Sequence, residues 1–189
     1  LGPGRGVGAE ARALGLAAVA AMRATVLDAD ALTSFADAPE ALFEGIDAAK
    51  GRVVLTPHTG EFRRLFPKIA ETWAADPTLS KVHAARQAAD LSGAVVLLKG
   101  PDTVIASPGG RASIHAAVYD RAAPWLATAG AGDVLAGLIT GLAARGYPLH
   151  TAAENGAWLH VEAALAFGPG LIAEDLPEMV PCVFRDMGL

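Results

Sequence analysis

The sequence predicts a single α/β domain with three layers, in which helices cover both faces of a mostly parallel sheet. Short apolar segments alternate with helical segments through the first half of the chain, and helices crowd its end. This order is typical of βαβ units, because parallel strands need a long crossover that is usually a helix. The 189 residues are enough for one domain with a sizeable core. We therefore expect residues 1–189 to form one domain.

Three short apolar segments are the expected parallel strands, at residues 24–27, 52–55 and 94–98. The third is a continuous apolar run, as found in strands that are buried on both faces of a sheet. A hairpin is predicted around a Pro-Gly-Gly turn, with strands at 103–106 and 111–115. The predicted helices lie at 9–22, 40–49, 60–66, 79–91, 132–145, 148–167 and 173–184. Segment 67–77, which begins and ends with proline, is expected to be a loop.

Charge and cysteine content exclude several classes of protein. The formal net charge is −5 and no Lys/Arg cluster offers a basic face, which argues against nucleic-acid and anionic-membrane partners. Cys182 is the only cysteine, so an internal disulfide and a cysteine metal site are excluded. Neither a signal peptide nor an apolar run long enough to span a bilayer is evident, and we expect a cytoplasmic protein.

The first residues indicate a domain that is truncated at its N-terminus. Leu1 leads directly into Gly2-Pro3-Gly4, which has the character of a loop between a strand and a helix. We therefore expect the preceding strand, and with it an N-terminal part of the domain, to lie before residue 1.

Polar segments follow the predicted strands, and a glycine-rich turn precedes the helix at 132–145. These segments are Asp28-Ala29-Asp30, Thr56-Pro57-His58, Lys99-Gly100 and Ala129-Gly130-Ala131-Gly132-Asp133. In open α/β sheets, ligands bind outside the carboxyl ends of the strands. We expect the four segments to meet at that edge of the sheet.

The glycine-rich turn predicts a phosphate site. Its small residues let backbone N–H groups converge, and the helix that follows adds positive potential at its N-terminus. Asp133 would then lie beside the phosphate, with a carboxylate able to act as a base. The alternative is that Asp133 only caps the helix and the glycines only permit tight packing. The apolar character of the helix favours the functional interpretation.

The other three polar segments each allow two interpretations. Lys99 could neutralise phosphate charge, or be a solvated lysine at the end of a strand. Asp28 and Asp30 could hold Mg²⁺ or ribose hydroxyls, or Asp30 could cap a short helix. His58 could donate a hydrogen bond to a ligand, or satisfy the backbone of its own loop.

The remaining histidines and tryptophans carry weaker signals. Four histidines have no metal-ligand spacing to a second ligand type. We therefore interpret them as structural or exposed: His83, His115, His150 and His160. Packing is expected of Trp73, Trp125 and Trp158, although Trp125 lies next to the glycine turn and could stack on a ligand. Neither the dinucleotide fingerprint nor a Walker A motif occurs, so any nucleotide site must be of another type.

Taken in order, these segments resemble the ribokinase-like superfamily and, more closely, the ADP-dependent NAD(P)H-hydrate dehydratases. The matching segments cover nearly the whole chain: Gly-Pro-Gly-x-Gly at 2–6, Leu-Asp-Ala-Asp-Ala-Leu at 27–32, Leu-Thr-Pro-His-x-Gly-Glu at 55–61, Leu-Lys-Gly-x-x-Thr-Val-Ile at 98–105, Trp-Leu-Ala-Thr-Ala-Gly-x-Gly-Asp at 125–133 and Gly-Leu-Ile-Ala-Glu-Asp-Leu at 170–176. The Gly-x-Gly-Asp turn is common to the superfamily, whereas the Thr-Pro-His and Leu-Ala-Thr-Ala-Gly segments together are more specific. Thr59 stands where the family usually has proline.

The resemblance implies a ribokinase-like three-layer α/β/α catalytic domain that dehydrates the (S)-hydrate of NADH or NADPH with ADP as co-substrate. Asp133 is then the catalytic residue, and the hydrate is bound by Gly4, His58 and Asp133. The nucleotide-binding residues implied are Lys99, Gly100, Pro101, Asp102, Thr103, Gly130 and Gly132. Mg²⁺ is the expected counter-ion, with no protein ligand assigned to it. A homo-oligomer is also expected, since members of the superfamily often assemble.

Two other functions stay open on the sequence. The chain could be a kinase of the same superfamily that phosphorylates a vitamin-like alcohol, because the same turn can activate an alcohol. It could also be a nucleotide-binding remnant without enzymatic activity, which acts as a sensor or as one part of a larger fusion. The Thr-Pro-His-x-Gly-Glu segment favours the dehydratase, but the sequence does not distinguish NADH from NADPH hydrate or ADP from ATP.

Overall fold

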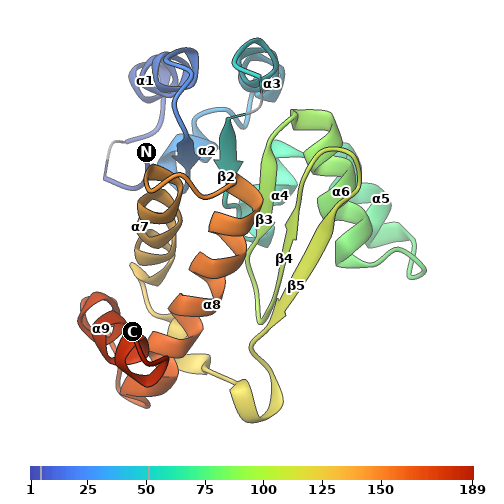
Figure 1. Ribbon diagram of the computed structural model, residues 1–189. Helices are drawn as coiled ribbons and strands as arrows, with labels where there is room; N and C mark the ends of the chain where they lie inside the picture. The colour runs from blue at the N-terminus through green and yellow to red at the C-terminus, as the bar shows by residue number, and fades with distance from the viewer. Residues whose placement is uncertain (5, 51) are drawn as a thin grey trace.

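Five strands form one sheet within the described residues, which are 1–189 except 5 and 51 (Figure 1). In this computed structural model the strands lie side by side in chain order: β1 (Thr25–Leu27), β2 (Val53–Leu55), β3 (Val95–Leu98), β4 (Asp102–Ala106) and β5 (Ala112–Ala116). β1, β2 and β3 pair in parallel, whereas β4 pairs antiparallel with both β3 and β5. Four strands therefore run in one direction, which confirms the mostly parallel sheet and the predicted hairpin.

Helices cover both faces of the sheet, as the order of the predicted elements requires. The helices of the described residues are α1 (Ala9–Ala20), α2 (Asp30–Thr33), α3 (Pro39–Ala48), α4 (Thr59–Leu65), α5 (Pro67–Ala75), α6 (Lys81–Ser92), α7 (Ala131–Ala144), α8 (Leu149–Phe167) and α9 (Asp175–Asp186). Short 3₁₀ turns, η1 (Tyr119–Arg121) and η2 (Pro124–Ala127), connect β5 to α7. The helices before β3 pack on one face, and α7 and α8 pack on the other.

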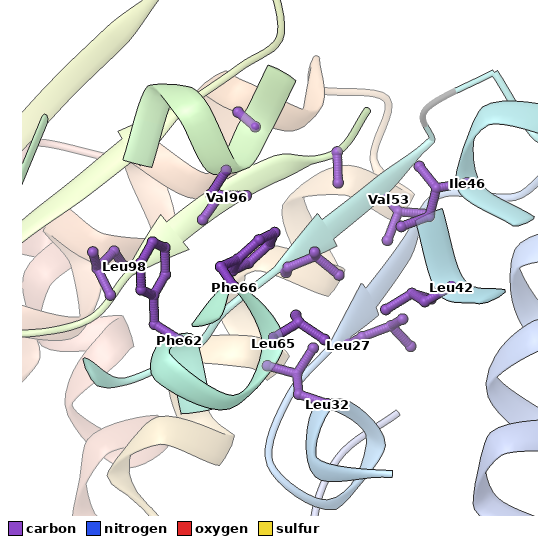
Figure 2. Packing of buried hydrophobic residues seen from close by; sticks show 14 of the residues in the cluster. Leu27, Leu32, Leu42, Ile46, Val53, Phe62, Leu65, Phe66, Val96 and Leu98 are labelled. Atoms are coloured by element: carbon purple, nitrogen blue, oxygen red, sulfur yellow. The ribbon is translucent and has the colours of Figure 1, made fainter. Parts of the chain in front are cut away.

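The strands divide their side chains between two cores because successive residues of a strand point to opposite faces. In β3, Val96 and Leu98 belong to the core under the early helices, and Val95 and Leu97 belong to the core under α7 and α8. All four are buried, as the continuous apolar run predicted. Figure 2 shows the first of these cores, where Phe62 and Phe66 lie against the sheet.

Residues 67–77 correct one prediction, because most of this segment is a helix and not a loop. Pro67 is the first residue of α5, where a fixed φ and a missing N–H cost nothing. The helix turns Ala70 toward the core and sets Trp73 edge-on to Phe62, with ring centroids 6.2 Å apart. A proline at the start of a segment is compatible with a loop and with the first turn of a helix, and here it begins a helix.

Two further features bear on the edges of the fold. Leu1 lies along β1: its amino group donates to the carbonyl oxygen of Val26 at 2.8 Å, and its carbonyl oxygen accepts from the amide of Asp28 at 3.0 Å. The outer edge of β1 therefore has a partner at this point. Among the described residues, none of the helices has the length and apolar character needed to cross a bilayer.

Candidate active site

The carboxyl ends of the three parallel strands meet, as predicted, at the N-terminal end of α7. Lys99, which follows β3, donates a hydrogen bond from Nζ to Oδ1 of Asp28, which follows β1, at 2.7 Å. The same Nζ lies 3.8 Å from Oε2 of Glu61 in α4, which follows β2. A Cβ built on Gly132 would lie 3.3 Å from Lys99 Nζ. Segments far apart in the chain thus converge on one lysine.

The Asp28–Lys99 pair lies beneath the site. Asp28 is 1% exposed and the Lys99 side chain is 19% exposed, so Lys99 is not the solvated lysine of the alternative interpretation. Within the described residues, Oδ2 of Asp28 is buried without a hydrogen-bond partner. Burying an acceptor in this way costs free energy, and native proteins retain such groups mainly where function requires them. Asp30 is separate from the pair, because its Oδ2 accepts from the amide of Gly6 at 3.2 Å.

Asp133 lies in the first turn of α7, where it is exposed to solvent. The pKa of its carboxyl group is shifted from its ordinary value. Partial burial raises the pKa of this carboxyl above its ordinary value, and the negative charge of Asp28 raises it further. Lys99 acts in the opposite direction, and Asp30 adds a smaller increase. The carboxylate is therefore electrostatically coupled to the buried pair and is more basic than an ordinary aspartate. A raised pKa of this kind suits a general base.

The alternative role of Asp133 as a helix cap is not borne out. Gly130 is the N-cap of α7, in the left-handed conformation with φ +87°, and no side chain caps this helix. The amide of Asp133 donates to the carbonyl oxygen of Gly130 at 3.0 Å, and the amide of Ala131 donates to Thr128 at 3.4 Å. The amides of Gly130 and Gly132 have no acceptor among the described residues. Two backbone donors therefore remain available at this helix N-terminus.

A cavity of about 680 Å³ opens beside this turn, between the β4–β5 hairpin, the η turns, α7 and α8. Its walls are mostly apolar, with small residues such as Ala123 and Ala157 and the larger Leu126 and Leu135. Five of the seven residues predicted to bind nucleotide line it: Lys99, Gly100, Pro101, Thr103 and Gly132. Pockets of this size and character, with a few converging polar groups, suit a nucleotide-sized ligand.

The other two predicted nucleotide-binding residues do not line the cavity. The carboxylate of Asp102 is paired with Lys81 at 2.8 Å. Gly130 packs closely against Ala173: a Cβ added at Gly130 would lie 2.9 Å from the Cβ of Ala173. These contacts give both residues a part in shaping the turns on either side of the cavity.

His58 and Gly4, the predicted hydrate-binding residues, lie on exposed loops. Nδ1 of His58 accepts from the amides of Gly60 and Glu61, at 2.9 and 3.3 Å, and Glu61 accepts from the His58 amide at 2.8 Å. His58 thus caps α4, which confirms the structural interpretation of this residue. Its side chain is 55% exposed, and its Nε2 lies 3.6 Å from Oε1 of Glu61. Gly4 has φ +76°, and a Cβ added there would meet nothing within 4 Å.

Sequence reasoning missed His160 and His115, which both line the cavity. His160 is 7% exposed and its Nε2 lies 2.8 Å from the carbonyl oxygen of Ala131, directly under the glycine turn. Burial lowers the pKa of His160 to about 4, so the neutral ring donates from Nε2. The signal was the run of small residues Ala153, Gly156 and Ala157 on the same buried face of α8.

The tryptophans pack, as predicted. Trp125, which could have stacked on a ligand, donates its indole N–H to the carbonyl oxygen of Ala164 at 3.0 Å and is absent from the cavity wall. Trp158 packs in the core between α8 and α9.

The sheet order, the two helical layers and the glycine turn at the N-terminus of α7 define an α/β domain of the ribokinase-like class. The sequence profile described as NAD(P)H-hydrate dehydratase matches residues 1–179, and the chain belongs to this family. It is 39% identical over 184 residues to the bifunctional NAD(P)H-hydrate repair enzyme of Mycobacterium leprae, covering 95% of this chain and 36% of that protein. It is 40% identical over 141 residues to the ADP-dependent (S)-NAD(P)H-hydrate dehydratase of Neisseria meningitidis, covering 74% of this chain and 44% of that protein.

Solved structures share the fold. A ribokinase-like superfamily protein of Enterococcus faecalis superimposes with a TM-score of 0.75 at 24% identity, covering 98% of this chain and 62% of the other. The ADP/ATP-dependent NAD(P)H-hydrate dehydratase of Bacillus subtilis, co-crystallised with ATP and Mg²⁺, superimposes with a TM-score of 0.60 at 21% identity. That match covers 95% of this chain and 87% of the other. By contrast, the chain spans less than half the length of the two curated relatives, from Mycobacterium leprae and Neisseria meningitidis.

Proposed function

We propose that residues 1–189 form a catalytic domain that removes water from the (S)-hydrate of NADH or NADPH, with ADP as co-substrate. Family membership and the names of the relatives support this reaction. The observation that supports it here is that Lys99 and Gly132 line a nucleotide-sized cavity, while the carboxyl group of Asp133, the next residue, interacts electrostatically with Lys99 and Asp28. We infer that a general base, a phosphate site and a pocket for the nucleobase lie next to one another.

The reaction follows from the weakness of hydroxide as a leaving group. Asp133 takes the proton of the hydroxyl on C6 of the hydrate, and the oxygen attacks the terminal phosphorus of ADP. The bond from that phosphorus to the bridging oxygen breaks and AMP leaves. The lone pair of the ring nitrogen then expels the phosphorylated oxygen as phosphate, and proton loss restores the dihydronicotinamide. In this proposal, the amides of Gly130 and Gly132, which have no acceptor among the described residues, would bind phosphate oxygens as charge develops.

In this proposal, Lys99 binds the phosphates of the nucleotide and the apolar cavity binds its purine. The ammonium of Lys99, already held by Asp28, faces the turn where the phosphates would lie. The apolar walls around Leu126 and Leu135 suit the flat face of a purine. His58 and Gly4 would contact the hydrate from the open side of the site.

Mg²⁺ fits this site as a companion of the phosphates. No three His, Cys, Asp or Glu side chains among the described residues are grouped so as to hold a metal ion. Mg²⁺ is usually bound through substrate phosphates and water together with only one or two carboxylates, so it does not need such a group of side chains. When bound, it supplies charge neutralisation on the phosphates. The cytoplasmic location and the homo-oligomer stay predictions.

The direct test is turnover of hydrate by this chain. Fluorescence of the reduced nicotinamide should recover when hydrate and ADP are supplied together, and not when hydrate is supplied without ADP. Asp133→Asn should lower kcat by about 100-fold or more while ADP binds within roughly threefold of wild type. Asp47→Asn, in an exposed position on α3, is the matched control and should turn over normally. Normal turnover by Asp133→Asn would remove that carboxylate from the mechanism.

A further inference from the structure

Lys81 is a largely buried cation in a position that helices disfavour. It is the first residue of α6, and its side chain is only 12% exposed. The N-terminus of a helix carries positive potential, so a lysine there is repelled by the helix itself. The helix does not use this side chain for capping, because Ser80 and His83 form the capping box. The lysine must therefore be stabilised by contacts outside the helix.

Those contacts are all with the turn between β3 and β4. Lys81 Nζ donates to the carbonyl oxygen of Lys99 at 3.3 Å, to the carbonyl oxygen of Asp102 at 2.8 Å and to Oδ1 of Asp102 at 2.8 Å. An ammonium group has three N–H donors, and all three are used. Lys81 therefore has no donor left for a phosphate, and its contacts can only shape the turn.

The turn is built around this ammonium. Gly100 has φ +157°, and a Cβ added there would lie 2.6 Å from Lys81 Nζ. A side chain at position 100 would displace the ammonium from its present contacts with the two carbonyl oxygens. Thr103 closes the other side, with Oγ1 donating to the carbonyl oxygen of Gly100 at 2.8 Å. The ammonium thus sets the path of the backbone that carries Lys99, Gly100 and Pro101 into the cavity wall.

We propose that Lys81 is a positioning residue for the nucleotide: its ammonium holds the 99–102 turn in the shape that binds ADP, and Asp102 serves as its partner and not as a ligand of the nucleotide. This inference rests on the proposed function. It differs from the prediction made from sequence, in which Asp102 itself binds the nucleotide. Both residues act through the same turn, so their effects on ADP affinity must depend on each other.

A double-mutant cycle on ADP affinity separates the two roles. Lys81→Met should weaken ADP binding about tenfold, since charge-assisted hydrogen bonds to the turn are lost. Asp102→Ala should weaken it less, roughly threefold, because the two carbonyl contacts of Lys81 survive. The double variant should bind like Lys81→Met alone. Lys81→Gln, whose amide keeps two donors, should fall between wild type and Lys81→Met, and exposed Lys68→Met on α5 is the matched control.

The readouts distinguish positioning from general loss of the fold. KM for ADP should follow the dissociation constants while kcat changes less than about twofold, and thermal unfolding of each variant reports folding separately. Should Lys81→Met fail to fold, Lys81→Gln and Asp102→Ala complete the test. Wild-type ADP affinity in Lys81→Met or in Lys81→Gln overturns the proposal. Multiplied losses in the double variant also overturn it.

Failure of the proposed function can be distinguished from failure of the proposal for Lys81. A wild-type chain that binds ADP but does not convert hydrate refutes the dehydratase reaction, and the cycle on ADP affinity still decides the role of Lys81. A wild-type chain that binds no ADP refutes both.

Discussion

Lowering the pH should destabilise this protein through His160. Burial, with smaller contributions from His115 and Lys99, lowers the pKa of this ring from 6.5 to about 4, although the hydrogen bond to Ala131 opposes the shift. The unfolded chain therefore takes up a proton near pH 6.5 that the folded chain refuses until about pH 4. Because the unfolded state binds more protons in this window, stability is complete above it and is lost as the pH falls.

The size of the loss follows from the two pKa values. Between pH 7 and pH 5, proton linkage at His160 alone removes about 2 kcal/mol from the free energy of unfolding. His160→Gln keeps an N–H donor for the Ala131 carbonyl and removes the titration. Urea unfolding of wild type and His160→Gln at both pH values measures the difference. Other titrating groups, including His115 and His150, contribute equally to both proteins and cancel.

The expected outcome is a pH-induced loss of stability that is smaller in His160→Gln than in wild type by about 2 kcal/mol. If the two proteins lost the same free energy between pH 7 and pH 5, His160 would not be neutral and buried under the glycine turn. The reasoning about the Ala131 contact would then be refuted as well.

Two further predictions concern the groups around Asp133. Asp28→Asn removes a like charge that raises the pKa of the Asp133 carboxyl, so the acid limb of the pH profile of kcat/KM should move to lower pH; an unmoved or higher limb would contradict the coupling. Alanine substitutions at the two glycines of the turn should have different effects, one on stability and the other on ADP binding. Gly130→Ala forces a side chain into the left-handed region and against Ala173, and should lower the free energy of unfolding by about 1–3 kcal/mol in denaturant titrations. Gly132→Ala places a methyl group beside Lys99 and should leave the fold intact but weaken ADP binding roughly tenfold, as measured by calorimetry. Equal effects of the two substitutions on stability would argue against this division.

Much of the architecture could be predicted because its causes are local. Apolar runs, turn residues and helix periodicity act over a few positions, so the strands, the hairpin and most helices were predicted to within about two residues. The exceptions are α5, which begins at a proline, a residue common both in loops and at helix starts, and the short α2, which was considered only as an alternative role of Asp30. The glycine turn and Asp133 were also evident, since a helix N-terminus preceded by small residues is a local feature.

What the sequence determined by itself is the order of the elements, the edge of the sheet where polar segments gather, and the turn that offers backbone amides. Only the tertiary structure decided which of those polar groups are partners. Asp28 and Lys99 are 71 positions apart, Lys81 and Asp102 are 21 apart, and His160 reaches a carbonyl 29 positions away. Each of these side chains is compatible with a solvated position when only its neighbours in sequence are considered. Their pairing arises because the sheet and its helices bring segments that are distant in sequence together and remove Asp28 and His160 from water, and both effects are properties of the folded chain as a whole.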